Sequence, residues 1–391
     1  FAPTQRPAEP QSRLRVLLLL SSTAFALSSA SRQALWAGVN LPWNQFGYDI
    51  GGSAWNSTYF STSFESIKSY GANSVRFWLH ADGRSTPTFS EDGEVTGMGG
   101  PNFGSDLMQL VELAKAHELV LQLCLWSFDM CKGEDRHTDL ISNVTKTDSY
   151  VKNALTPMLE LLRGSKHVVI EAINEPEWCM KSFCEADECV EVSDMQRFTA
   201  KIAEAVHSLS TLRVTTGSAS LKFSSAGRGE AAYWNDASLR TAFPSTVGVL
   251  DFYNVHYYDW MFDPKKVSSW DMCSESADWW DLDKPTVVAE LPASSEHFAT
   301  EQMLECSSAN GFAGNLFWAF NDPAFPLAPA LPALENFTAA RSEVTSFHAL
   351  LMWLDHLPPV SSGSAAANEV VALESLTPAA ARSLIEHNIL V

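Results

Sequence analysis

Residues 120–125, VLQLCL, and residues 168–173, VVIEAI, are two runs of strand length in which almost every side chain is apolar. A strand reads as a near-continuous apolar run when both of its faces are covered, as in a parallel sheet. Between the two runs, apolar residues recur at helical spacing, at Val151, Leu155, Met158, Leu159 and Leu162. The order strand, helix, strand therefore predicts a parallel α/β unit.

The same unit recurs on both sides of this stretch. Further strands are predicted at 35–40, 74–79, 213–216, 252–255, 286–289 and 315–320, and helices at 58–70, 107–114, 198–209 and 339–354. Eight such units predict an α/β fold, a (β/α)8 TIM barrel with enlarged loops on its C-terminal face. A doubly wound sheet is the alternative, but it would place a glycine fingerprint after the first strand. The glycines here, at 97, 99, 100 and 104, follow the second strand, and we interpret them as turn residues.

The two ends of the chain differ in composition from the predicted barrel, which spans residues 31–356. Residues 1–30 are predicted to hold a secretory signal, because Arg13 and Arg15 precede an apolar run too short to cross a bilayer and Ala30 offers a cleavage site. A buried helix is the alternative. Residues 357–391 form a linker-like tail, rich in serine and alanine. The sequence thus predicts a secreted protein without membrane association after cleavage.

Seven cysteines in an oxidising compartment should form disulfides and leave one thiol over. Three of them cluster, at Cys179, Cys184 and Cys189, without the paired C-x-x-C spacing of a zinc site. Disulfides are therefore predicted over the alternative of zinc, and Cys124, inside a predicted strand, is the candidate free thiol. Three glycosylation sequons fit a secreted glycoprotein; they begin at Asn56, Asn143 and Asn336.

The formal net charge is -20. Such a surface would repel nucleic acid and anionic membranes, so neither is an expected partner, whereas it suits a neutral substrate. No cluster of His, Asp and Glu has convincing metal spacing, and no Gly-x-Ser-x-Gly elbow indicates a serine hydrolase. We expect a monomer that uses neither a metal nor a cofactor.

Two glutamates follow predicted strands directly: Glu175 after residues 168–173, and Glu290 after residues 286–289. Active sites of barrel enzymes lie at the C-terminal ends of the strands. Hydrolysis of a glycosidic bond needs two carboxyl groups there, one protonated and one ionised. The alternative is structural, since either glutamate could cap a helix or pair with an arginine.

The motif Asn174-Glu175-Pro176 after the fourth strand, with Glu290 after the seventh, resembles clan A retaining glycoside hydrolases, most like family 5. The resemblance covers most of residues 35–354. It implies that Glu175 is the acid/base, that Glu290 is the nucleophile and that Asn174 contacts the sugar 2-hydroxyl. For a retaining enzyme the two carboxyl groups should lie about 5 Å apart.

Other positions match the same family pattern. Arg76 matches the arginine that binds the nucleophile, and His256 and Tyr258 match the His-x-Tyr after the sixth strand. The resemblance implies that Arg76 and Tyr258 contact Glu290 and keep it ionised. Trp318 matches the tryptophan floor of the cleavage subsite.

The substrate is less sharply indicated. Many cellulases of family 5 carry a histidine at the end of the third strand, and residues 123–127 contain none. The segment 76–83, with Arg76, Trp78, Asp82 and Gly83, looks more like that of the family's β-mannanases, although Trp78 and Trp126 could equally be core. Further aromatic residues on the predicted loop face suit sugar stacking or loop packing: Trp43, Trp55, Trp178, Trp234, Trp260, Trp279 and Trp280.

We therefore expect a secreted, retaining endo-β-glycosidase that cuts a β-linked cell-wall polysaccharide or its oligosaccharides, with mannan favoured. An endo-β-glucanase of cellulase or β-1,3-glucanase type would use the same chemistry. A carbohydrate-binding barrel that no longer catalyses is the third possibility.

Overall fold

The computed structural model describes residues 33–360, apart from 53, 134–136, 185–188, 230, 266–268 and 359. The predicted secretory signal in residues 1–30 and all but the first residues of the tail at 357–391 lie outside the described residues. Within the described ranges, no helix is both long and apolar enough to cross a membrane.

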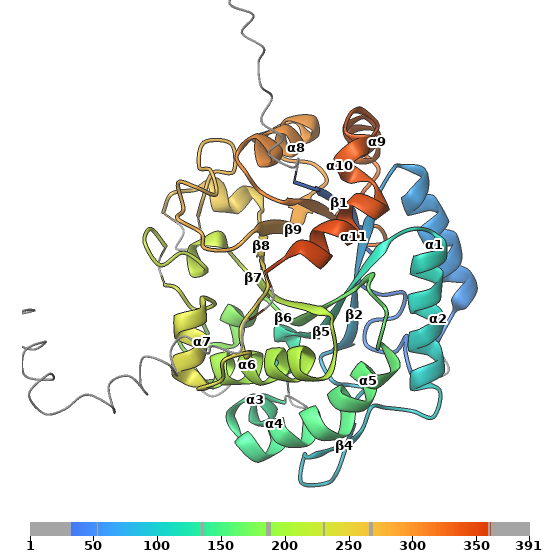
Figure 1. Ribbon diagram of the computed structural model, residues 1–391, viewed down its shortest axis with the longest axis vertical. Coiled ribbons are helices and arrows are strands. Elements are labelled where there is room, and N and C mark those ends of the chain that lie inside the picture. The colour runs from blue at the N-terminus through green and yellow to red at the C-terminus, as the bar shows by residue number, and fades with distance from the viewer. Residues whose placement is uncertain are drawn as a thin grey trace, which may run out of the picture. The chain divides into compact units, whose positions relative to one another are not determined.

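Eight parallel strands form a closed barrel, in the order β1-β10-β9-β8-β7-β6-β5-β2. Figure 1 shows these strands at the centre with helices around them. The strands are β1 (Trp36–Asn40), β2 (Ser74–Ala81), β5 (Val120–Ser127), β6 (Val168–Asn174), β7 (Arg213–Ser218), β8 (Tyr253–His256), β9 (Thr286–Pro292) and β10 (Gly314–Trp318). The predicted (β/α)8 barrel is confirmed, because each apolar run is a strand buried on both faces.

The helices that surround the barrel are amphipathic. In α1, the Asn56 side chain accepts a hydrogen bond from the Tyr59 amide at 2.9 Å and caps the helix, while Phe60, Phe64 and Ile67 are buried on one face. The full set is α1 (Ser57–Ser69), α2 (Phe103–Ala116), α3 (Thr138–Ser142), α4 (Val144–Tyr150), α5 (Thr156–Leu161), α6 (Val192–Leu209), α7 (Asp236–Ala242), α8 (Thr300–Ala309), α9 (Leu331–Ala340), α10 (Ser342–Thr345) and α11 (Phe347–His356).

Helices α3, α4, α7, α8 and most of α9 lie where no helix was predicted, and three further segments differ from the expectation. The single helix predicted at 339–354 is divided, because Ser346 adopts extended backbone and caps α11 by accepting from the Ala349 amide. The stripe at 151–162 begins with a π-helical turn, Val151–Leu155, before α5. The loop after β2 contains a hairpin of two short strands, β3 (Thr88–Phe89) and β4 (Val95–Gly97), so Gly97 belongs to a strand and not to a turn.

The barrel interior holds a buried ion pair. Arg76 on β2 donates to both carboxylate oxygens of Glu171 on β6, at 2.6 and 2.7 Å, and both side chains are fully buried. Burial acts to raise the pKa of Glu171, but the charge and hydrogen bonds of Arg76 leave it below its ordinary value. Gly217 on β7 makes room for the pair, since a Cβ atom there would lie 2.3 Å from Glu171 Oε1.

Six cysteines are paired, in the disulfides Cys131–Cys179, Cys184–Cys189 and Cys273–Cys306. Cys124 is free and buried. The prediction of disulfides and one buried thiol is therefore confirmed, and the zinc alternative for the cysteine cluster is wrong. The three sequon asparagines are exposed, and their glycosylation stays a prediction.

Candidate active site

The predicted site residues gather at the C-terminal ends of the barrel strands. Asn174 is the last residue of β6, and Glu175 follows it. Glu290 lies in β9, and His256 ends β8, with Tyr258 two residues beyond. The structure brings all of them, with Arg76, into one connected group of side chains.

The carboxyl groups of Glu175 and Glu290 face each other. Their nearest oxygens and a ring nitrogen of His256 all lie within 4.8 Å of one another. His256 Nδ1 is 2.8 Å from Glu175 Oε1 and 3.6 Å from Glu290 Oε2. This separation fits a retaining site, in which one carboxylate attacks the sugar directly, and leaves too little room for the water of an inverting one.

Glu290 lies among hydrogen-bond donors. Arg76 Nη1 donates to Oε1 at 2.8 Å, and the Tyr258 hydroxyl donates to Oε2 at 2.5 Å. The predicted contacts of Arg76 and Tyr258 with Glu290 are confirmed. Burial raises the pKa of Glu290 above its ordinary value, while His256, Arg76 and Tyr258 act in the opposite direction. Since Arg76 carries a permanent charge, these donors stabilise the ionised form of Glu290.

Glu175 has different surroundings. Its carboxylate accepts a hydrogen bond from Trp178 Nε1 at 2.9 Å and lies 2.8 Å from His256 Nδ1, and no arginine of the described part of the chain is paired with it. Burial raises the pKa of Glu175 to about 7, and a second buried group, His256, has its pKa lowered to about 4 and is neutral at neutral pH. The backbone of Glu175 is left-handed, at φ 44° and ψ 53°, a strained conformation of the kind that clusters at functional sites.

Arg76 donates hydrogen bonds to several side chains of the site. Besides Glu171 and Glu290, it donates to Asn174 Oδ1 at 2.7 Å and to Asn40 Oδ1 at 2.9 Å. Asn40 and Glu171 were not predicted as site residues. Both could have been found from the sequence. Asn40 is a polar residue at the end of a predicted strand, and Glu171 is a charged residue inside an apolar run, where a buried charge must be paired.

Aromatic rings form one wall beside Glu290. Trp318 packs against Trp78 with ring centroids 5.5 Å apart and against Trp43 at 6.0 Å, and Tyr258 borders the same cluster. The other aromatic residues of the loop face differ in their contacts and exposure. Trp178 contacts Glu175, whereas Trp234 and Trp280 are buried in loop packing and cannot be sugar platforms. Trp55 is partly buried and stacks on the core residue Phe60, and two rings are exposed, Trp260 and Trp279.

Glu175, His256 and Glu290 also have the spacing of three metal ligands. The oxygens of Glu290 are already taken by Arg76 and Tyr258, however, and a divalent cation there would lie close to the guanidinium charge. The surroundings therefore fit a carboxylate pair better than a metal centre.

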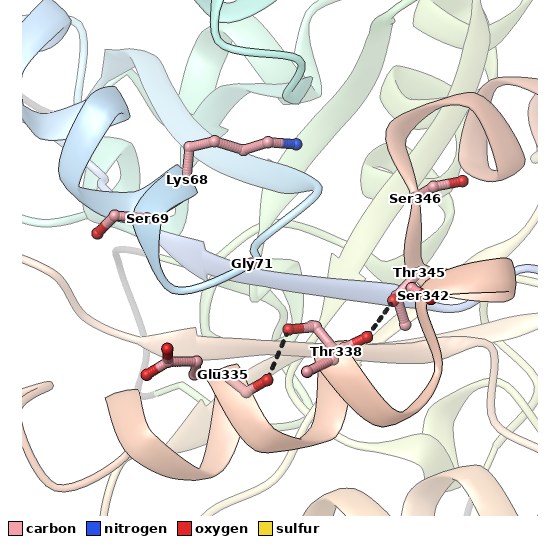
Figure 2. A pocket seen from close by; sticks show the side chains of 9 residues that line it. Lys68, Ser69, Gly71, Glu335, Thr338, Ser342, Thr345 and Ser346 are labelled. Atoms are coloured by element: carbon pink, nitrogen blue, oxygen red, sulfur yellow. Dashed lines mark hydrogen bonds between the residues drawn. The ribbon is translucent and has the colours of Figure 1, made fainter.

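A separate cavity of about 320 Å³ lies between the end of α1 and helices α9 and α10 (Figure 2). Gly71, which leads into β2, places it near the amino-terminal ends of the strands, away from the carboxylates. In its wall, the Thr338 hydroxyl donates to backbone carbonyls within α9, and the Thr345 hydroxyl of α10 donates to the backbone carbonyls of Thr338 and Arg341. These groups serve helix packing, so this cavity is not a candidate active site.

A further buried carboxylate, Glu177, fixes the turn that carries Glu175. It accepts hydrogen bonds from the Ser218 hydroxyl at 2.7 Å, the Ala219 amide at 2.9 Å and Trp234 Nε1 at 2.7 Å. Sequence reasoning missed this role, because a Glu beside the catalytic motif looks like any loop residue. The contacts tie the turn to the end of β7 and to the following loop.

We expect Glu177→Ala to lower the free energy of unfolding by about 3 kcal/mol, because the buried Ala219 amide and Trp234 Nε1 lose their acceptor, while the Ser218 hydroxyl can still donate to the Ser220 carbonyl at 2.9 Å. Glu177→Gln keeps the shape and one acceptor oxygen and should cost clearly less. Urea denaturation of the two variants and the parent measures this. Equal stability of all three proteins would contradict the assignment.

No family model matches the sequence. The chain is 28% identical over 329 residues to a mannan endo-1,4-β-mannosidase of Mytilus edulis, covering 78% of this chain and 88% of that protein. It is 26% identical over 313 residues to a mannan endo-1,4-β-mannosidase of Cryptopygus antarcticus, covering 73% and 80%. The X-ray structure of the β-mannanase from Mytilus edulis superposes with a TM-score of 0.73 at 25% identity, covering 80% of this chain and 94% of that one.

These matches cover 73–80% of this chain. They agree with the carboxylate pair at the C-terminal ends of β6 and β9. Because the chain shares sequence and fold with such enzymes over most of its length, it is a glycoside hydrolase, similar to these mannan endo-1,4-β-mannosidases.

Proposed function

We propose that this protein is a retaining endo-β-mannanase in which Glu290 is the nucleophile and Glu175 the acid/base. The observation that carries the proposal is the contrast between two neighbouring carboxyl groups. Burial raises the pKa of both groups, to about 7 for Glu175, but their donors differ: Glu290 accepts hydrogen bonds from a guanidinium and a phenol, whereas Glu175 accepts one from the indole of Trp178. Opposite surroundings of two such groups separate the acid from the nucleophile.

In the first step, a carboxylate oxygen of Glu290 attacks the anomeric carbon while the glycosidic C–O bond breaks. Glu175 gives its proton to the departing oxygen. In the second step, Glu175, now ionised, takes a proton from water, the water oxygen attacks the anomeric carbon, and the bond to Glu290 breaks. Each step restores the protonation state that the next one needs.

The neighbours of the two glutamates support this sequence. Arg76 and Tyr258 stabilise the charge of Glu290 before attack and after release. The side-chain oxygen Oδ1 of Asn174 accepts a hydrogen bond from Arg76. The side-chain amide nitrogen of Asn174 can therefore donate to the sugar 2-hydroxyl. Trp318 and Trp78 are 7% and 6% exposed, and the accessible part of their rings supplies an apolar contact for a pyranose.

The substrate is proposed from the relatives, whose names identify them as mannan endo-1,4-β-mannosidases. The test is reducing-sugar release from β-1,4-mannan, cellulose, xylan and laminarin by the purified protein. We expect mannan to be cleaved fastest, with internal cuts that lower viscosity early. Preferred cleavage of cellulose or laminarin would favour the endo-β-glucanase alternative, and no cleavage of any glycan would favour a binding barrel.

The pH dependence should report Glu175. Because burial raises the pKa of this acid to about 7, kcat/KM on oligosaccharides should fall as the pH rises through 7 and Glu175 loses its proton. An aryl glycoside with a good leaving group needs little protonation, so its kcat/KM should decline much less over the same range. Identical alkaline limbs for the two substrates would contradict the assignment of Glu175 as the acid.

We further propose that the protein is secreted and acts as a monomer. The three disulfides support an oxidising compartment.

A further inference from the structure

A second cavity, of about 600 Å³, opens on the catalytic face of the barrel. Its walls come from the loops after β1, β2 and β5, all of which follow the C-terminal end of a strand. The residues that line it are Tyr48, Asp82, Gly83, Arg84, Asp129, Lys132, Gly133 and His137. We call it the Tyr48 pocket. None of these residues is among those of the proposed reaction.

One side of the pocket is joined to the acid/base. Asp129 lies on the short helix Phe128–Cys131, whose Cys131 is disulfide-bonded to Cys179 in the turn that follows Glu175. The charges of Asp129 and Lys132 both act on the pKa of Glu175, in opposite directions. The pocket and the carboxylate pair are therefore neighbours, linked through a covalent bridge.

The other side is joined to the aromatic wall. The Arg84 guanidinium lies over the rings of Phe46, at 4.7 Å, and Tyr48, at 5.9 Å. Phe46 in turn packs on Trp78 with ring centroids 6.2 Å apart, and Trp78 packs on Trp318. Ring contacts thus lead from the proposed cleavage subsite to Phe46, and the Arg84 guanidinium links Phe46 to Tyr48 in the pocket.

The chemistry of the pocket suits a neutral polyol. Asp82 accepts hydrogen bonds from the Arg84 guanidinium, and Lys132 pairs with Asp129 at 3.4 Å, so these two anions and two cations balance. Neither an anionic nor a cationic ligand is favoured by such a set. Hydroxyl groups, which both donate and accept, can bind to its edges. Tyr48 is 45% exposed and offers a ring face for stacking.

We propose that the Tyr48 pocket is a subsite that binds a neutral pyranose unit of the polysaccharide away from the bond that is cut. Its volume lies within the range of about 300–1,000 Å³ that is usual for small-molecule sites. The inference rests on the proposed function, because it assigns the pocket to the same polymer. It predicts that the pocket raises the affinity and kcat/KM for long substrates and leaves those for short substrates unchanged.

The test is a comparison of substrates by length. Tyr48→Ala and Asp82→Asn should lower the ratio of kcat/KM on mannohexaose to kcat/KM on an aryl β-mannoside by about ten-fold, a loss of one stacking or polar contact. Tyr48→Phe keeps the ring and should retain most of the ratio. Asp355→Asn, which changes an exposed, lysine-paired carboxylate outside the pocket, is the matched control and should leave the ratio as it is.

Binding gives a second readout without turnover. In the Glu290→Ala background, Tyr48→Ala should weaken calorimetric binding of mannohexaose about ten-fold relative to mannobiose. An equal loss of affinity for both sugars, or no loss for either, would contradict the assignment of the pocket as a subsite. A parent enzyme that cleaves no manno-oligosaccharide would instead contradict the proposed function. The two outcomes can be distinguished, because the first is measured by comparing variants with the parent and the second on the parent alone.

Discussion

Replacement of Glu290 by Ala should abolish hydrolysis of every substrate, by about ten-thousand-fold or more. Without the carboxylate no glycosyl-enzyme can form, and a better leaving group cannot compensate for a missing nucleophile. The fold should persist, because Arg76 keeps its ion pair with Glu171. Initial rates on mannan and on an activated aryl glycoside measure the effect, with circular dichroism to verify folding.

The matched control is Glu301→Ala, which removes an exposed carboxylate in the first turn of α8. It should keep parent activity. Azide can occupy the space left by the Glu290 side chain and attack the sugar from the same face, so any product rescued in Glu290→Ala should be the α-glycosyl azide. A β-azide from this variant would mean that the two glutamates have been assigned the wrong roles.

Much of the fold could be predicted from the sequence because a parallel barrel buries both faces of every strand. Runs such as 120–125 and 168–173 can therefore be recognised as strands, although polar and apolar residues do not alternate in them. The elements that were missed have no such signature. The β3–β4 hairpin is too short to show a period of two, and the division of the last predicted helix depends on a single capping residue, Ser346.

The candidate site could likewise be predicted only in part. Glu175 and Glu290 could be predicted because a charged residue directly after an apolar strand is unusual, whereas Arg76 was predicted only from the family pattern. The role of Trp178 was not, since a loop tryptophan gives the same sequence signal whether it stacks on sugar or donates to a carboxylate. Trp234 is the converse case: it looks like a groove residue and is instead buried against Glu177.

Replacement of Glu175 by Ala should produce a different and leaving-group-dependent defect. Hydrolysis of mannan should fall by about a thousand-fold or more, because the departing sugar oxygen no longer receives a proton. An aryl glycoside whose leaving group is already a stable anion should still form the glycosyl-enzyme at an appreciable rate. Release of the aryl group should then show a burst, because the second step lacks its base.

Azide separates this variant from Glu290→Ala. A small anion needs no general base, so it should attack the accumulated glycosyl-enzyme of Glu175→Ala and restore turnover. Because Glu290 has already inverted the anomeric carbon once, the second inversion gives the β-glycosyl azide. Trp178→Phe, which removes a hydrogen bond to Glu175 but not the carboxyl group, is the milder comparison and should need no azide. Slow turnover of Glu175→Ala on mannan and aryl glycoside alike, without rescue, would exclude Glu175 as the acid/base.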